Sequence, residues 1–186
     1  MARLENYIKN SKVLEFPLFR QTFGWDCGTT ALNMVLAFYG HDENAEVIIR
    51  ATGAKPEAGT PIEGIKKAAK KYGLKFREDY NLSIDDLKKS IDDGKPVLIM
   101  IQAWTREDNP DWENEWDQGH YTVCIGYDKN RLFFSDPANI KKTWLSNGDL
   151  NSRWHGWDDN GKKVGHWGLV FLNKSKYSHD EVEEMG

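Results

Sequence analysis

The first half of the chain carries apolar residues at helical spacing. Residues 29–39 are mostly apolar, which is typical of a buried helix, and Gly40 is a natural stop. Further helices are expected over residues 44–52, over residues 61–73 and over residues 83–93. Thr60 is expected to cap the third helix with Glu63 completing a capping box, and Ser83 to cap the fourth in the same way.

The second half changes to the period of strands. Strands are expected at residues 96–102, 121–127, 131–135, 142–145 and 164–172, and the turn at residues 128–130 makes the second and third of them a hairpin. Helices followed by an antiparallel sheet predict an α+β fold, in which N-terminal helices pack on a C-terminal sheet. The length of 186 residues suits a single domain over residues 1–186.

Two long segments interrupt these elements, and both are rich in tryptophan. Residues 104–119 contain Trp104, Trp112 and Trp116, and residues 146–163 contain two more tryptophans and a histidine. Loops of this length in a compact domain are often functional. Two readings stay open: the tryptophans cover the core, or they line a substrate groove.

Composition and charge exclude several classes of protein. A chain that is 39% hydrophobic and has 23 aromatic residues can bury a core, and none of its apolar runs is long enough to cross a bilayer. The net charge of −4 is a poor match for nucleic acid or anionic lipid. The N-terminal residues lack a signal-peptide pattern, so we expect a cytoplasmic protein with no membrane insertion.

Metal binding is not expected from the pattern of acidic residues. The acidic run over residues 107–117 lacks the spacing of a calcium-binding loop, and two cysteines cannot form an all-cysteine zinc site. We therefore expect a solvated acidic loop, and no metal or cofactor.

The segment around Cys27 carries the strongest chemical pattern. Cys27 lies just before the buried helix, where the unpaired amides of a helix N-terminus favour a thiolate. A thiolate is the nucleophile that acyl transfer needs. Gly28 would let a substrate approach the backbone, and Gln21 would join the Cys27 amide in an oxyanion hole. The alternative is an unreactive buried cysteine, which is the reading expected for Cys124 in the middle of a strand.

A base and its orienting group are found in the predicted hairpin. His120 begins the first strand, and Asp136 follows the second, so a turn near residue 128 would place residue 120 opposite residue 136. Asp136 would then hold the imidazole. His166 also begins a strand-like run, but no aspartate follows at hairpin distance, and we interpret it as structural or groove-lining.

These motifs together resemble the papain-like cysteine peptidases of the bacteriocin-processing type. The hallmarks are Gln21 six residues before Cys27-Gly28, then Gly119-His120-Tyr121-Thr122-Val123, then Ser135-Asp136-Pro137. Weaker matches are Gly59-Thr60-Pro61 and Gly94-Lys95-Pro96-Val97, and the resemblance covers residues 18–138. It implies a papain-like fold with Cys27 as nucleophile, His120 as base and acid, Asp136 as orienting group and Gln21 as oxyanion donor.

The segments 104–119 and 139–186 lie outside the pattern of that family, the latter being expected to form strands and a charged tail. No transporter follows in the chain, so a double-glycine leader is not assumed as the substrate. We expect a peptide or protein substrate and a groove formed by Trp25, Trp104, Trp116 and Gly119. The predicted activity is a thiol hydrolase of peptide or isopeptide bonds. Other thioester-forming transfer (transpeptidase, deamidase or amidase) and a non-catalytic peptide-binding module stay open.

Overall fold

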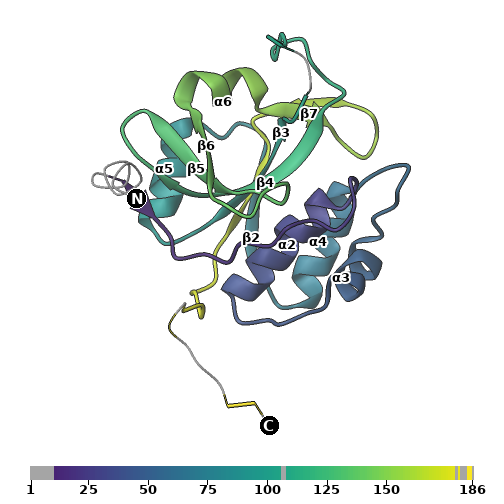
Figure 1. The fold of residues 1–186 in the computed structure, drawn as a ribbon, viewed down its shortest axis with the longest axis vertical. Coiled ribbons are helices and arrows are strands. Elements are labelled where there is room, and N and C mark those ends of the chain that lie inside the picture. Colours follow the sequence, from purple (N-terminus) through teal and green to yellow (C-terminus); the bar gives the residue numbers. More distant parts are fainter. Residues whose placement is uncertain (1–10, 106–107, 179, 181–183, 186) are drawn as a thin grey trace.

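The computed structural model describes residues 11–105, 108–178, 180, 184 and 185. Helices α2 (Cys27–Phe38), α3 (Ala45–Thr52) and α4 (Ile62–Lys71) form one layer, and an antiparallel sheet lies beside it (Figure 1). Helices α5 (Ile84–Asp92) and α6 (Asn147–Arg153) pack on the other face of the sheet. The fold is the α+β arrangement predicted from the sequence. In the part of the chain described, no helix is both long and apolar enough to cross a membrane.

The sheet has the strand order β2-β9-β3-β4-β5-β6, and β1 also pairs with β4. Every neighbouring pair is antiparallel. The strands are β1 (Lys12–Val13), β2 (Phe76–Asp79), β3 (Val97–Gln102), β4 (Gly119–Tyr127), β5 (Arg131–Ser135), β6 (Thr143–Ser146) and β9 (Gly168–Phe171). A separate hairpin pairs β7 (His155–Trp157) with β8 (Lys163–Gly165).

Two hydrophobic clusters lie on the two faces of the sheet because side chains alternate along a strand. On β4, Val123 and Ile125 pack against α2, whereas Cys124 packs in the other cluster with residues of α5 and α6. Burial of these alternate rows fixes which face each β4 residue occupies.

The helix starts confirm one cap prediction and correct another. Ser83 and Asp86 form the expected capping box at the start of α5. The prediction for Thr60 was wrong: α4 begins at Ile62, and the Thr60 hydroxyl instead accepts a hydrogen bond from the Thr29 amide of α2 at 3.2 Å. The amides of Ile62 and Glu63 donate to the Asp159 carboxylate, from a hairpin nearly one hundred residues away, at 2.7 and 2.8 Å.

The structure departs from the predicted strands in three places. The short strand β2 was not predicted, and residues 146–163 contain α6 and β7 where the sequence predicted an irregular segment. The strand expected over residues 164–172 divides into β8 and β9, because His166 adopts a left-handed backbone conformation between them, with φ of 52°. Of the acidic run over residues 107–117, Glu107 lies outside the described residues.

Candidate active site

Cys27 is the first residue of α2 and is buried, with 9% of its surface exposed. The loop before it is held by Asp26, whose carboxylate accepts hydrogen bonds from the amides of Thr22 and Phe23. The Asp26 carbonyl accepts the first helical bond, from Thr30, at 2.9 Å. The loop and the helix together therefore fix the backbone on both sides of Cys27.

Gly28 is needed for packing. A Cβ atom at Gly28 would lie 2.7 Å from Thr60 Cβ and 2.7 Å from Tyr121 Cδ2. Such distances are too short for carbon atoms, so only glycine lets α2 approach the Thr60 turn and β4 this closely. The expectation that Gly28 also opens the backbone to substrate stays a prediction.

His120 and Asp136 are joined by a buried hydrogen bond. His120 Nε2 lies 2.7 Å from Asp136 Oδ1, and both residues are nearly fully buried. The same carboxylate accepts from the Ala138 amide at 2.9 Å and from the Thr143 hydroxyl at 3.4 Å. These contacts fix the carboxylate, and it in turn fixes the ring.

The predicted register of the hairpin was wrong although the contact is formed. The β4–β5 ladder ends with Val123 opposite Ser135, and a bulge between Cys124 and Gly126 shifts the pairing. His120 lies opposite Ile101 of β3. The side chains of His120 and Asp136 meet beyond the end of the ladder.

The Cys27 thiol hydrogen-bonds with the His120 side chain and with the amides of Tyr121 and Gly28. Because Nε2 of His120 faces Asp136, the ring presents Nδ1 to the sulfur. Burial raises the pKa of Cys27, but these hydrogen bonds and the His120 charge outweigh it, so the net shift is downward. Burial lowers the pKa of His120, but its bonds to Asp136 and Cys27 prevail and raise the pKa to about 9. Each partner therefore stabilises the charged form of the other, a thiolate beside an imidazolium.

Gln21 lies beside this group through its backbone. Its amide donates to the Pro137 carbonyl at 2.8 Å, directly after Asp136. Its side-chain Nε2 donates to the Phe23 carbonyl at 2.6 Å, and its Oε1 is buried without a partner among the described residues. The structure brings Gln21 to the Asp136–Pro137 turn, and its role as an oxyanion donor stays a prediction.

A cavity of about 770 Å³ opens at Cys27. Of the residues predicted to line a groove, Trp25, Trp116 and Gly119 line this cavity. Trp104 does not: it lines a smaller cavity next to Asp136. The structure therefore separates Trp104 from the other three.

One wall of the Cys27 cavity was missed by sequence reasoning. It is formed by Trp157, Asp158 and Asp159 at the end of β7. Trp157 Nε1 donates to the Trp116 carbonyl at 2.9 Å, and the Lys163 ammonium lies 4.1 Å from the centroid of a Trp116 ring. The tryptophan content of both long segments indicated a groove, but their contact with each other could not be read from the pattern.

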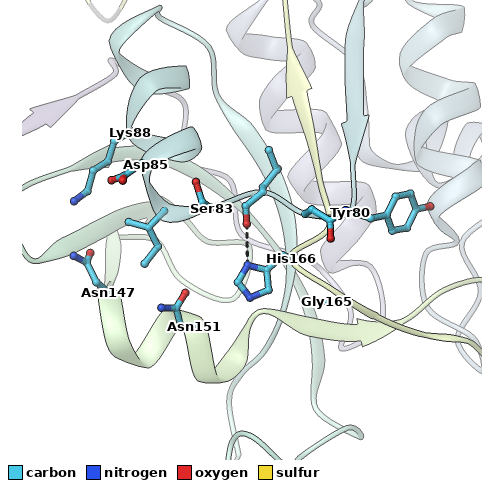
Figure 2. A pocket seen from close by; sticks show the side chains of 11 residues that line it. Tyr80, Ser83, Asp85, Lys88, Asn147, Asn151, Gly165 and His166 are labelled. Atoms are coloured by element: carbon cyan, nitrogen blue, oxygen red, sulfur yellow. Dashed lines mark hydrogen bonds between the residues drawn. The ribbon is translucent and has the colours of Figure 1, made fainter.

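Two other histidines, His166 and His155, have hydrogen-bond partners of their own. Figure 2 shows His166 in a polar cavity beside Tyr80 and Ser83, with Nδ1 2.8 Å from the Leu82 carbonyl oxygen. Its ring also stacks on Trp154, in keeping with a structural role. His155 Nε2 lies 2.7 Å from the Glu115 carbonyl oxygen. Within the described residues, no three His, Cys, Asp or Glu side chains gather as metal ligands would.

Comparison with known proteins assigns the chain to a family. The model of the Peptidase_C39 like family matches residues 13–162. The chain belongs to this family. A lactococcin transport/processing ATP-binding protein of Lactococcus lactis is 31% identical over 135 residues, and the pediocin PA-1 transport/processing protein PedD of Pediococcus acidilactici is 28% identical over 130. The matched parts are 70% and 69% of this chain but only 16% of each relative.

Solved structures share the papain-like peptidase fold. A putative C39-like peptidase from Bacillus anthracis superposes with a TM-score of 0.67 at 19% identity, covering 90% of this chain and all of that one. A double glycine motif protease from an AMS/PCAT transporter, solved in complex with the leader peptide, has a TM-score of 0.60 at 21% identity over 86% of this chain and 92% of that one. The Streptococcus ComA peptidase domain also has a TM-score of 0.60, over 84% of this chain and 98% of that one.

Proposed function

We propose that this protein is a cysteine peptidase that hydrolyses a peptide or isopeptide bond through an acyl-enzyme. Cys27 is the nucleophile, His120 the general acid and base, and Asp136 the group that orients the imidazole. The observation that carries the proposal is the hydrogen-bonded series from Asp136 through His120 to Cys27, with the sulfur at a helix N-terminus and at the edge of a large cavity. An unreactive buried cysteine needs none of these contacts.

The geometry supports the two steps of acyl transfer. The Cys27 thiolate attacks the carbonyl carbon, and the imidazolium of His120 gives its proton to the leaving amine, which leaves a thioester on the sulfur. Neutral His120 then takes a proton from water, whose oxygen attacks the thioester; the carbon–sulfur bond breaks, the acid product leaves, and the Cys27 thiolate is restored beside the imidazolium. Asp136 keeps the ring oriented in both steps, since its carboxylate bonds to the nitrogen that faces away from the sulfur.

The negative oxygen of the tetrahedral intermediate needs donors. We assign this role to the backbone N–H of Cys27 and the side-chain amide of Gln21, whose backbone is bonded to Pro137. The Gln21 side chain has to exchange its bond to the Phe23 carbonyl for the substrate. Gln21→Ala is therefore expected to lower kcat about 10²-fold with little change in KM.

The substrate we propose is a peptide that lies along the cavity wall of Trp25, Trp116 and Trp157. Flat aromatic surfaces suit an extended chain, and a cavity of about 770 Å³ has room for several residues. A peptide substrate also agrees with the structural neighbour that was solved with a leader peptide.

Mass spectrometry tests the proposal. The full chain is incubated with a peptide library that includes double-glycine sequences, and both new termini and a peptide adduct on Cys27 are sought. Cleavage with an adduct on Cys27 is expected for the wild type and absent for Cys27→Ala, whereas Cys124→Ser, the matched control, cleaves like the wild type. Cleavage that survives Cys27→Ala contradicts the proposal.

Added amine acceptors separate hydrolysis from transfer. Hydrolysis gives only the free acid, since water is the acceptor. Amide products formed in preference to the acid would instead make the protein a transpeptidase with the same nucleophile. Peptide that binds with equal affinity to the wild type and Cys27→Ala, and is never cleaved, would indicate a binding module.

A further inference from the structure

A second, smaller cavity lies on the face of the sheet opposite α2. Its volume is about 210 Å³, and its apolar lining includes Ile101, Phe134 and Leu145 from β3, β5 and β6. Asp136 and Thr143 line one part of it, and Arg153, the last residue of α6, lines another. The cavity therefore lies behind the catalytic group, separate from the Cys27 cavity.

Arg153 brings a positive charge to this cavity that no described residue neutralises in an ion pair. Its Nε is buried and has no hydrogen-bond partner within the described part of the chain. The nearest acid on its own helix, Asp149, is engaged in the cap of α6, where it bonds to the Ser146 hydroxyl at 2.7 Å. A buried guanidinium donor without a partner is costly to retain unless an anion meets it.

The guanidinium also lies over an aromatic ring. Arg153 Cζ is 3.9 Å from the centroid of a Trp112 ring. A contact over the face of the guanidinium leaves its N–H groups, which point outward in the plane, free to bind a carboxylate. This differs from Arg50, an exposed arginine that lies 3.9 Å from Glu46 on the surface of α3.

The two threonine hydroxyls of the cavity already have partners. The Thr122 hydroxyl donates to the Ser135 carbonyl, and the Thr143 hydroxyl donates to Asp136. Asp136 is the other titratable residue that lines the cavity, and its carboxylate is paired with the His120 imidazole. An entering anion therefore meets one unpaired cation and an apolar floor.

We propose that this cavity is a binding site for a small carboxylic acid with an apolar body, whose carboxylate pairs with Arg153 while its body covers Phe134 and Ile101. The exposed Trp104 lies at the same cavity, in a left-handed backbone conformation with φ of 67° that is uncommon for tryptophan. The site is distinct from the proposed peptide site, so either can exist without the other.

Isothermal titration calorimetry of the full chain tests the site with two matched probes, phenylacetate and its neutral amide, phenylacetamide. The wild type is expected to bind phenylacetate at least about tenfold more tightly than the amide, because only the acid forms a charge-assisted bond with Arg153. Arg153→Gln is expected to remove this preference. Arg50→Gln is the matched control and keeps it, and Cys27→Ala also keeps it because the site is not the catalytic cavity.

Three results would overturn the proposal. They are equal binding of the acid and the amide by the wild type, a preference for the acid that survives Arg153→Gln, and no binding of phenylacetate at millimolar concentration. The first comparison needs no variant, so it holds even if Arg153→Gln unfolds. None of these results bears on peptide cleavage at Cys27.

Discussion

The two cysteines are both buried, but the pKa values of their thiols shift in opposite directions. Cys27 and Cys124 are both buried and both free thiols. Around Cys124, burial raises the pKa to about 12, and the nearest polar partner is the Gly126 carbonyl, 3.9 Å from the sulfur. Around Cys27, burial also raises the pKa, but His120 and two backbone amides reverse the shift. Burial alone therefore does not decide whether a cysteine is reactive; the donors around the sulfur do.

The largest expected effect is in the rate at which the two thiols are alkylated. With iodoacetamide at pH 7, we expect Cys27 to react at least about 10⁴-fold faster than Cys124, because only the thiolate reacts and Cys124 holds its proton. Peptide mapping of the labelled protein by mass spectrometry measures both rates. His120→Ala should slow Cys27 strongly and leave Cys124 unlabelled; equal labelling of both in the native wild type would remove the contrast.

The next prediction concerns Asp136, a carboxylate that has no counterpart around Cys124. Asp136→Asn is expected to lower kcat/KM for peptide cleavage by about 10²- to 10⁴-fold, since the amide no longer stabilises the imidazolium or holds the ring. Steady-state kinetics with the peptide identified above measures the change. Asp128→Asn, at the turn after β4, is a control that removes a carboxylate far from the sulfur and should leave kcat/KM within about twofold. Loss of activity in both variants would indicate a general effect of charge.

The pH dependence of cleavage tests the ion pair itself. The pKa of His120 is raised to about 9, so the imidazolium is present below that pH and is lost above it. We therefore expect kcat/KM to fall above about pH 9, about tenfold per pH unit, and the Cys27 thiolate to persist well below the pKa of a free thiol. In Asp136→Asn the alkaline limb should move to lower pH, because one of the bonds that raise the His120 pKa is weakened. If the alkaline limb does not move, Asp136 does not contribute to the raised pKa of His120.

The smallest effect is in stability, where the order of the two cysteines is reversed. Cys124→Ala removes a sulfur from a closely packed strand and is expected to lower the free energy of unfolding by about 1–2 kcal/mol while leaving kcat/KM unchanged. Cys27→Ala removes a partly desolvated thiolate at the edge of a cavity and is expected to cost less than about 1 kcal/mol. Urea unfolding followed by circular dichroism compares them. A larger loss in Cys27→Ala would make its contacts mainly structural.

Several local features were predictable because they depend on neighbours in the sequence. The capping box of Ser83 and Asp86 forms from residues three apart, and the turn at residues 128–130 joins β4 to β5 as expected. The buried helix expected over residues 29–39 follows from its apolar run, although α2 begins two residues earlier, at Cys27. These features need only local hydrogen bonds and a hydrophobic period, so their sequence patterns are informative.

Other features failed because a distant segment supplied the partner. Thr60 has the pattern of an N-cap, but its hydroxyl bonds to α2, and Asp159 takes over the amides of α4. The turn centre lies further along the chain than residue 128, since Tyr127 pairs with Leu132, so the predicted pairing of His120 with Asp136 is not part of the ladder. The close packing of Gly28 against Thr60 and Tyr121 was not predicted.

The sequence by itself determined the α+β order, the buried helix that follows Cys27 and the set of residues whose chemistry fits acyl transfer. The tertiary structure alone decided that the imidazole meets the sulfur and the carboxylate at once, that Trp104 lines a different cavity from Trp25, and that Arg153 Nε has no hydrogen-bond partner among the residues that the structure describes. The physical reason is that residue type and local period fix what a side chain can do and which face it occupies. Hydrogen bonds and burial between segments far apart in the chain decide which other groups that side chain acts on.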